Sequence, residues 1–165
     1  MIIGLISDTH GLLREEVVEN LLDCDLIIHA GDIGKIEVIE KLRTISKIEY
    51  IRGNCDKNIN SNFAPDDKII DVMGARIYLI HNIDKINIDL KKESISIVVY
   101  GHSHKSKIYE NDGIIYINPG SVGPRRFKLP IEMAKLTINH KFDNGNVKNN
   151  IVRYKEYQIE QIVIK

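Results

Sequence analysis

The segment Met1-Ile2-Ile3-Gly4-Leu5-Ile6-Ser7-Asp8-Thr9-His10 opens the chain with an apolar run that ends in an acid and a histidine. Its first part, Ile2 to Ile6, is typical of a buried strand. Leu12 to Leu22 follows with apolar residues at helical spacing over charged positions, and Leu26 to Ile28 predicts a second strand. The chain therefore begins with a strand, a helix and a strand.

The same order then repeats. Ile36 to Leu42 forms a second helical stripe, and Ile48 to Ile51 predicts a third strand. Strands that alternate with helices predict a parallel sheet with right-handed crossovers. Beyond Pro65 the chain is rich in strands, which we expect at Lys68 to Val72, Arg76 to Ile80, Ile95 to Tyr100, Ile108 to Tyr109, Ile114 to Ile117, Met133 to Ile138 and Val147 to Tyr154.

Three turn sequences separate pairs of these later strands. Met73-Gly74-Ala75 and Asn111-Asp112-Gly113 each predict a hairpin, and Asn144-Gly145 predicts a third one between Met133 to Ile138 and Val147 to Tyr154. A linker rich in glycine, serine or proline is not evident between the two halves. We therefore predict a single α/β domain over residues 1–165, with two packed sheets flanked by helices.

Composition sets bounds on the function. The 165 residues include 23 basic and 23 acidic ones, so a broad charged field for nucleic acid or membrane is not expected. The two cysteines, Cys24 and Cys55, are too few for a disulfide framework. The N-terminus does not resemble a signal peptide, and an apolar stretch of ~20 residues is lacking. We expect a cytoplasmic protein without an obligatory nucleic-acid or membrane partner.

Polar side chains follow the strands at the points where the strands end. Asp8 and His10 follow the first strand, Asp32 the second and Asn54 the third. Ligands of open α/β sheets bind beyond the carboxyl ends of the strands, where these side chains would meet. Together with His81 and the pair in Gly101-His102-Ser103-His104, they supply enough oxygen and imidazole donors for two adjacent metal ions.

These blocks resemble the calcineurin-like metallophosphoesterases, whose pattern runs DxH, GD, GN(H/C)D, a lone His and GHxH. All five blocks occur here in that order, and Asn118-Pro119-Gly120-Ser121 is similar to the loop that follows them in the family. The chain looks most like the small, single-domain YfcE-type phosphodiesterases. The resemblance implies a four-layer αββα sandwich of two mixed sheets flanked by helices.

The resemblance also implies two divalent ions, with manganese or nickel favoured and iron, zinc or magnesium as alternatives. Asp32 would bridge them, and a hydroxide shared by the ions would attack a phosphodiester directly. Asp8, His10, Asp32 and His104 would hold one ion, and Asp32, Asn54, His81 and His102 the other. Asp32, Asn54, Cys55 and His81 are the candidate catalytic residues.

Cys55 departs from many relatives, which carry a histidine there as general acid. A thiol with a pKa of ~8.5 is a poorer proton donor than imidazolium at neutral pH, so substrates with poor leaving groups should suffer most. Arg125, in the pair with Arg126, is a candidate phosphate contact because guanidinium matches paired phosphate oxygens. His29 is expected to shape a loop rather than bind metal.

Other functions stay open at this point. A phosphomonoesterase or a nucleotide pyrophosphatase would use the same fold and the same metals. The scaffold subunit of retromer also resembles these phosphodiesterases, but it has a degraded metal site and acts by binding proteins. The intact set of ligands favours an enzyme with a small phosphodiester substrate, and a homo-oligomer is left open.

Overall fold

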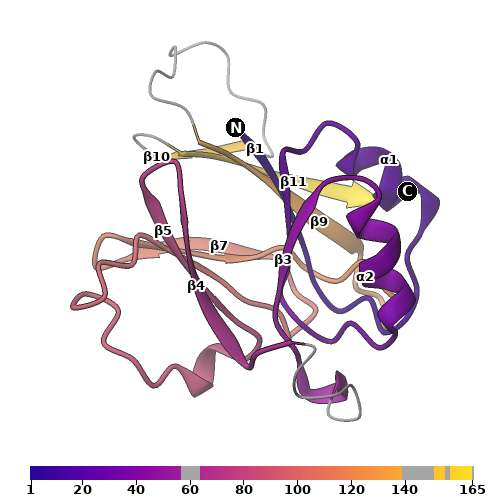
Figure 1. Cartoon of the computed structure of the whole chain (residues 1–165), viewed down its shortest axis with the longest axis horizontal. Helices are drawn as coiled ribbons and strands as arrows, with labels where there is room; N and C mark the ends of the chain where they lie inside the picture. The colour runs from indigo at the N-terminus through magenta and orange to yellow at the C-terminus, as the bar shows by residue number, and fades with distance from the viewer. Residues whose placement is uncertain (57–63, 139–150, 155–156, 165) are drawn as a thin grey trace.

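The computed structural model of the chain describes residues 1–56, 64–138, 151–154 and 157–164. Two sheets stack on each other, and both α-helices lie beside β3, β9 and β11, away from β4, β5 and β7 (Figure 1). The predicted α/β sandwich of two mixed sheets is confirmed.

The first sheet has six strands in the order β10-β11-β9-β1-β2-β3. The three strands at one end, β1, β2 and β3, run parallel to one another, as the alternating strand and helix pattern predicts. β9 is antiparallel to β1, and β11 is antiparallel to both β9 and β10. The bounds are β1 Ile2–Ile6, β2 Leu26–His29, β3 Lys47–Tyr50, β9 Ile131–Ile138, β10 Ile151–Tyr154 and β11 Tyr157–Ile164.

The second sheet has five strands in the order β4-β5-β6-β8-β7. Its centre, β5, β6 and β8, is parallel, and an antiparallel partner flanks it on either side. The predicted turns at Met73-Gly74 and Asp112-Gly113 join these hairpins, with positive φ angles at all four residues. The bounds are β4 Asp67–Val72, β5 Ala75–Ile80, β6 Ile97–Val99, β7 Lys107–Asn111 and β8 Ile114–Asn118.

Two short helices cover the outer face of the six-stranded sheet. α1 (Glu15–Leu21) buries Val17 and Leu21, and α2 (Ile36–Arg43) buries Val38, Ile39 and Leu42. Acidic residues in the first turn of each helix complement the positive end of its dipole. None of the helices in the described ranges combines the length and the apolar character needed to cross a membrane.

Successive side chains of a strand point to opposite faces of its sheet, so the core is divided into layers. Ile3 and Leu5 of β1 point between the sheets and pack with Ile77 and Leu79 of β5. Ile6 belongs to the cluster beneath the helices. Side chains of a strand alternate between two faces, so one strand can serve both layers.

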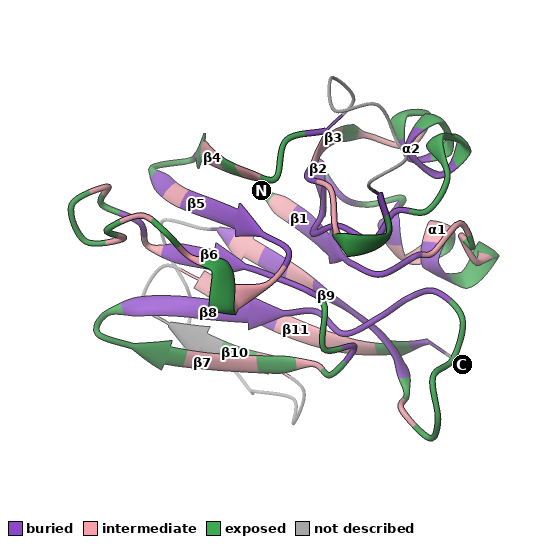
Figure 2. Cartoon of the chain, turned by 90° about the horizontal axis from the view of Figure 1, so that it is seen from below, coloured by how far each residue is buried: buried purple, intermediate pink, exposed green. Residues whose placement is uncertain are grey.

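Flanking helices are predicted for both sheets, but an irregular segment covers the outer face of the five-stranded sheet. The aromatic and aliphatic side chains on this face pack against Ile83, Ile86, Ile88 and Leu90, which lie in an irregular segment with one 3-10 turn, η2 (Ile83–Lys85). Buried residues concentrate in β5, β6 and β8, whereas the edge strand β7 is largely exposed (Figure 2). Among the described residues, α-helices therefore cover one of the two sheets.

The predicted hairpin between Met133 to Ile138 and Val147 to Tyr154 is wrong. β11 lies between β9 and β10 and pairs with both of them. The sequence pattern does not predict a strand at 157–164, and without that strand the segments around 133–138 and 147–154 are neighbours in the sequence. The turn at Asn144-Gly145 lies outside the described residues.

Candidate metal centre

The polar blocks follow strands of both sheets and meet at one edge of the sandwich. The Asp8 loop follows β1, His81 follows β5, and the His102 loop follows β6. The backbone N–H of His102 donates to Asp8 Oδ2 across 3.2 Å, and the N–H of Gly101 donates to the carbonyl of His81 across 3.0 Å. These contacts bring together ligands that are up to 94 residues apart in the sequence.

One group of donor atoms consists of Asp8, His10 and His104. Asp8 Oδ1 lies 3.2 Å from His104 Nε2 and 3.9 Å from His10 Nε2. The two Nε2 atoms are 3.3 Å apart, and their rings stack at an interplanar angle of 13°. All three donor atoms lie within 4.8 Å of one another, which suits a single small cation.

Asp32 lies between this group and the next one. Its Oδ2 is 3.8 Å from His10 Nε2 and 3.4 Å from His81 Nε2. Its other oxygen, Oδ1, accepts the backbone N–H of Cys55 at 2.8 Å. This hydrogen bond fixes the carboxylate so that Oδ2 faces a histidine on either side.

The second group contains His81, His102 and Asn54. The rings of His81 and His102 meet edge to face with centroids 5.4 Å apart, and Asn54 Nδ2 lies 3.1 Å from His102 Nδ1. Rotation of the Asn54 amide by half a turn would present its oxygen in place of its nitrogen. His102 and Asn54 are exposed, whereas His81 is buried, so this group opens toward solvent.

The donor atoms fit divalent cations. Asp8 Oδ1 and His81 Nε2 are buried and have no hydrogen-bond partner among the described residues. Such atoms are costly unless something satisfies them. The facing Nε2 atoms of His10 and His104 also need a proton or a cation between them. Imidazole and carboxylate donors in this arrangement suit manganese, iron, nickel or zinc.

Burial and charge set the protonation of these ligands. Burial raises the pKa of Asp8 to about 6 and lowers the pKa of His104 to about 4. Burial would also raise the pKa of Asp32, but the adjacent His81 ring and the hydrogen bond from the Cys55 N–H outweigh it and hold that pKa below its usual range. His104 is therefore a neutral imidazole at neutral pH, as a metal ligand must be.

The backbone at the centre is unusual. Asp8, His10, Asp32, His102 and His104 have φ angles of 57°, 47°, 55°, 69° and 56°. Few residues other than glycine adopt this left-handed region, although Asp and His do so more often than most, and such residues cluster at functional sites. The turns direct successive ligands toward one point.

Gly53 makes this close packing possible. A Cβ atom at this position would collide with the backbone nitrogen and the carboxylate of Asp32. The loop after β3 can therefore lie directly against the loop after β2 only because residue 53 has no side chain.

Asp56 is a positioning residue that the sequence reading missed. It follows Cys55 in the 3-10 turn η1 (Asn54–Asp56), and its carboxylate is fully buried. It accepts the backbone N–H groups of Ile33, Gly34 and Gly53 at 3.0, 2.8 and 2.8 Å. Asp56 thereby ties the loop of Asp32 to the loop of Asn54.

His29 shapes the loops from behind, in line with its expected role. Its Nδ1 accepts the N–H of Gly31 at 3.2 Å, and its Nε2 donates to Thr9 Oγ1 at 2.8 Å. The Thr9 hydroxyl then donates to the carbonyl of Ile33 at 2.9 Å. These hydrogen bonds join the Asp8 loop to the Asp32 loop. Burial lowers the pKa of His29 to about 4, so its ring is neutral.

Cys55 and the arginine pair lie at the exposed rim. Cys55 Sγ is within 4.8 Å of donor atoms of His10 and Asp32, and burial and the Asp32 charge raise the pKa of its thiol. Arg126, rather than Arg125, is the arginine beside the ligands, with Nη2 at 3.4 Å from His10 Nε2. Arg125 is exposed, and its role as a substrate contact stays a prediction.

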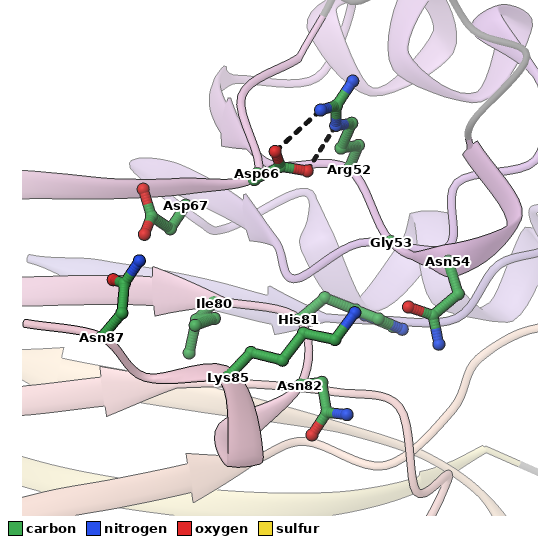
Figure 3. Close-up of a pocket in the computed structure, with 10 residues that line it drawn as sticks. All are labelled: Arg52, Gly53, Asn54, Asp66, Asp67, Ile80, His81, Asn82, Lys85 and Asn87. Atoms are coloured by element: carbon green, nitrogen blue, oxygen red, sulfur yellow. Dashed lines mark hydrogen bonds and ion pairs between the residues drawn. The ribbon is translucent and has the colours of Figure 1, made fainter.

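A polar cavity of about 430 Å³ adjoins the second group of ligands. Asn54 and His81 form one end of it, and Lys85 extends along the cavity toward that end (Figure 3). Arg52 lies on its wall, held by hydrogen bonds of 2.5 and 2.7 Å to the carboxylate of Asp66. The cavity thus offers amides and a flexible cation next to the metal centre.

The chain is similar to proteins of known family. A probable metallophosphoesterase of Methanocaldococcus jannaschii is 30% identical over 157 residues, covering 87% of this chain and 79% of the relative. The solved structure of an archaeal phosphodiesterase has a TM-score of 0.72 at 24% identity, and the match covers 99% of this chain and 100% of the phosphodiesterase. Vacuolar protein sorting 29 of Cryptosporidium parvum has a TM-score of 0.71 at 17% identity, with 99% and 97% covered.

The two likenesses to solved structures show the shared fold. The sequence itself carries the family assignment, because residues 1–141 match the domain of one family, and the five polar blocks of the metal centre all lie within that range. The chain belongs to the calcineurin-like phosphoesterase superfamily.

Proposed function

We propose that this protein is a metal-dependent phosphodiesterase with a dinuclear centre. The observation that carries the proposal is the position of Asp32 Oδ2, which lies 3.8 Å from His10 Nε2 and 3.4 Å from His81 Nε2. One carboxylate between two groups of imidazoles is the arrangement that two adjacent ions need. Asp8, His10, Asp32 and His104 would hold one ion, and Asp32, Asn54, His81 and His102 the other.

Two bound divalent ions would polarise the phosphate oxygens and acidify a water molecule, so hydrolysis would need no protein nucleophile. The protein's own residues supply position and charge. The neutral Asn54 adds no negative charge beside an anionic substrate. Arg126, with its guanidinium at 3.4 Å from His10 Nε2, can contact a phosphate oxygen at the rim. Cys55 holds its proton at neutral pH, because burial and Asp32 raise its pKa.

The space around the centre favours a diester over a monoester. The polar cavity of about 430 Å³ reaches Asn54 and His81, and a second cavity of about 840 Å³ reaches His102 and His104. A diester has two substituents on its phosphate, and each cavity can take one of them. The structural likeness to an archaeal phosphodiesterase supports the same choice. We further propose that the substrate is a small diester in the cytoplasm.

The test starts from protein stripped with a chelator. Hydrolysis of bis(p-nitrophenyl) phosphate and of p-nitrophenyl phosphate is measured after separate addition of manganese, nickel, magnesium, zinc and iron. We expect a transition metal to restore diester hydrolysis, with two ions per chain by mass spectrometry. Asp32→Ala and His102→Ala should abolish that turnover, and retained turnover in both variants would rule out the dinuclear mechanism.

Two other outcomes would redirect the assignment. A preference for the monoester would indicate a phosphatase. Metal binding without turnover of any ester would indicate a protein-binding scaffold, a function consistent with the fold that the chain shares with vacuolar protein sorting 29.

A further inference from the structure

A cavity of about 840 Å³ lies directly beside the candidate metal centre and is lined by His102 and His104 but not by Asn54 or His81. Its walls are two loops, residues 102–105 after β6 and residues 126–129 before β9. His102 and His104 therefore belong both to the metal centre and to this cavity, which we call the 127 groove. Any substrate held at the metal centre lies within reach of the groove.

Phe127 is the feature that distinguishes the groove. Its side chain is 94% exposed, and its backbone has a φ angle of 53°. A bulky residue in this left-handed region is a rare and strained conformation, which structures retain where it serves a function. Single exposed apolar residues are common on protein surfaces. Phe127 differs from them because it lines a cavity that shares two side chains with a catalytic centre.

Three cationic residues line the groove together with Phe127. Arg126 and Lys128 flank Phe127 in the sequence, and Lys105 lies on the opposite wall. Within the part of the chain that the structure describes, none of the three forms a salt bridge. Arg126 reaches the centre itself, with Nη2 at 3.4 Å from His10 Nε2. The groove thus combines a flat aromatic surface with unpaired positive charge.

This combination matches a nucleotide better than a lipid. A nucleobase stacks on an aromatic face, whereas an acyl chain needs a long apolar channel without charge. Guanidinium and ammonium groups bind phosphate oxygens. We propose that the 127 groove binds the base of a nucleoside phosphodiester by stacking on Phe127, with Arg126 on its phosphate. The inference rests on the proposed phosphodiesterase activity and names its substrate class.

The reaction that follows is ordinary hydrolysis. The oxygen of water bonds to phosphorus, one ester P–O bond breaks, and the departing alcohol takes up a proton from the water. The products are a nucleoside monophosphate and an alcohol. No oxidant, reductant or further co-reactant is needed.

Two substrates with the same leaving group test the proposal. p-Nitrophenyl thymidine 5′-phosphate carries a nucleoside as its second substituent, and p-nitrophenyl ethyl phosphate carries an ethyl group. We expect Phe127→Leu to lower kcat/KM for the nucleoside ester about tenfold through KM, because stacking contributes on that order. The ethyl ester should be unaffected. Phe127→Tyr should behave as the unaltered protein, because it keeps the aromatic face.

Met73→Ala is the matched control. Met73 is also an exposed apolar residue, 50% accessible, with a φ angle of 51°, but it lies in the turn between β4 and β5 and does not line the groove. Its substitution should change neither ester's kinetics. An equal response of both esters to Phe127→Leu, or no response, would overturn the assignment of the groove.

Calorimetric titration of thymidine 5′-monophosphate separates this inference from the proposed function. We expect binding that Phe127→Leu weakens about tenfold and Phe127→Tyr preserves. If neither ester is hydrolysed but this pattern of binding holds, the groove stands and the phosphodiesterase proposal fails. If the esters are hydrolysed but binding does not depend on Phe127, the groove proposal alone fails.

Discussion

His81 donates its Nδ1 proton to the carbonyl oxygen of Ala30, and the two atoms are 2.7 Å apart. Ala30 lies two positions before Asp32, so this bond ties a proposed metal ligand of the five-stranded sheet to a loop of the six-stranded one. It also fixes the tautomer, leaving Nε2 to face Asp32 Oδ2 at 3.4 Å. Hydrogen bonds of this kind orient metal-bound histidines and are nearly as important as the ligands.

Removal of His81 should therefore empty one of the two proposed metal positions. We expect His81→Ala to retain about one ion per chain and to lose turnover by about 100-fold or more, because a ligand and its orientation are lost together. Metal content by mass spectrometry after gel filtration checks this. Asn82→Ala is the control for metal content and should keep two ions, because Asn82 is not a proposed ligand and caps the turn η2 by accepting the N–H of Asp84 at 3.0 Å. Two ions retained in His81→Ala would contradict the assignment.

Metal affinity should fall as the pH falls. Burial raises the pKa of Asp8 to about 6, and the Asp32 carboxylate outweighs burial and raises the pKa of His81. Both groups hold protons that an ion must displace, so binding releases protons and acid opposes it. His104 does not add to this effect near neutrality, because its pKa is lowered to about 4.

Titration calorimetry between about pH 5 and pH 8, in buffers of different ionisation enthalpy, measures the protons released. We expect affinity to weaken by up to about tenfold per pH unit below the pKa of Asp8. Asp8→Asn should bind metal more weakly and with a shallower pH dependence. Affinity that stays constant over the whole range would contradict the prediction.

Asp56→Asn tests whether the buried carboxylate holds the loops. An amide can accept only through its oxygen, so its NH₂ group would face at least one backbone N–H of Ile33, Gly34 or Gly53. We expect a loss of about 2–3 kcal/mol in the free energy of unfolding, measured by urea denaturation of metal-free protein. Asp66→Asn, in the exposed pair with Arg52, should cost less than about 1 kcal/mol. Equal losses in both variants would refute the role of Asp56.

The sequence was sufficient for the parts of the fold that local pattern determines. The parallel strands β1, β2 and β3 and the position of the polar residues at their ends followed from apolar runs that stop at polar residues. The place of β11 did not, because strand order depends on pairing between distant segments. Residues 157–164 mix Gln and Glu with Ile, which lacks the clear alternation of a half-buried strand.

Side-chain direction was the other gap. Asp56 follows Cys55 directly in the sequence, but the 3-10 turn η1 leaves Cys55 exposed and buries Asp56, so its positioning role is not evident from the sequence. The sequence does not distinguish Arg125 from Arg126, and only the loop geometry shows that Arg126 lies beside His10, whereas the role of Arg125 stays a prediction. Spacing along a chain indicates which residues are near a site, but φ and ψ decide which of them point into it.

Cys55 offers a test of how the leaving group departs. Cys55 is an exposed residue. Partial desolvation of its sulfur and the nearby Asp32 charge nevertheless oppose the thiolate and raise the pKa of the thiol. It can hold a proton but gives it up poorly near neutral pH, so expulsion of a basic alkoxide should be slow. The exposed position leaves room for a larger ring. We expect Cys55→His to raise kcat/KM for poor leaving groups by about 10–100-fold, with little gain for p-nitrophenolate.

The measurement is the slope of log kcat/KM against leaving-group pKa for a series of aryl and alkyl methyl phosphates. The histidine variant should show a flatter slope, and its gain should decrease as the pH rises above the imidazole pKa of about 6.5. Cys55→Ser is the control: it has a similar size but does not act as an acid at neutral pH, so its slope should match that of the unaltered protein. An unchanged slope in Cys55→His would mean that another group protonates the leaving oxygen. Arg126 would not be that group, because a guanidinium does not release its proton in this range.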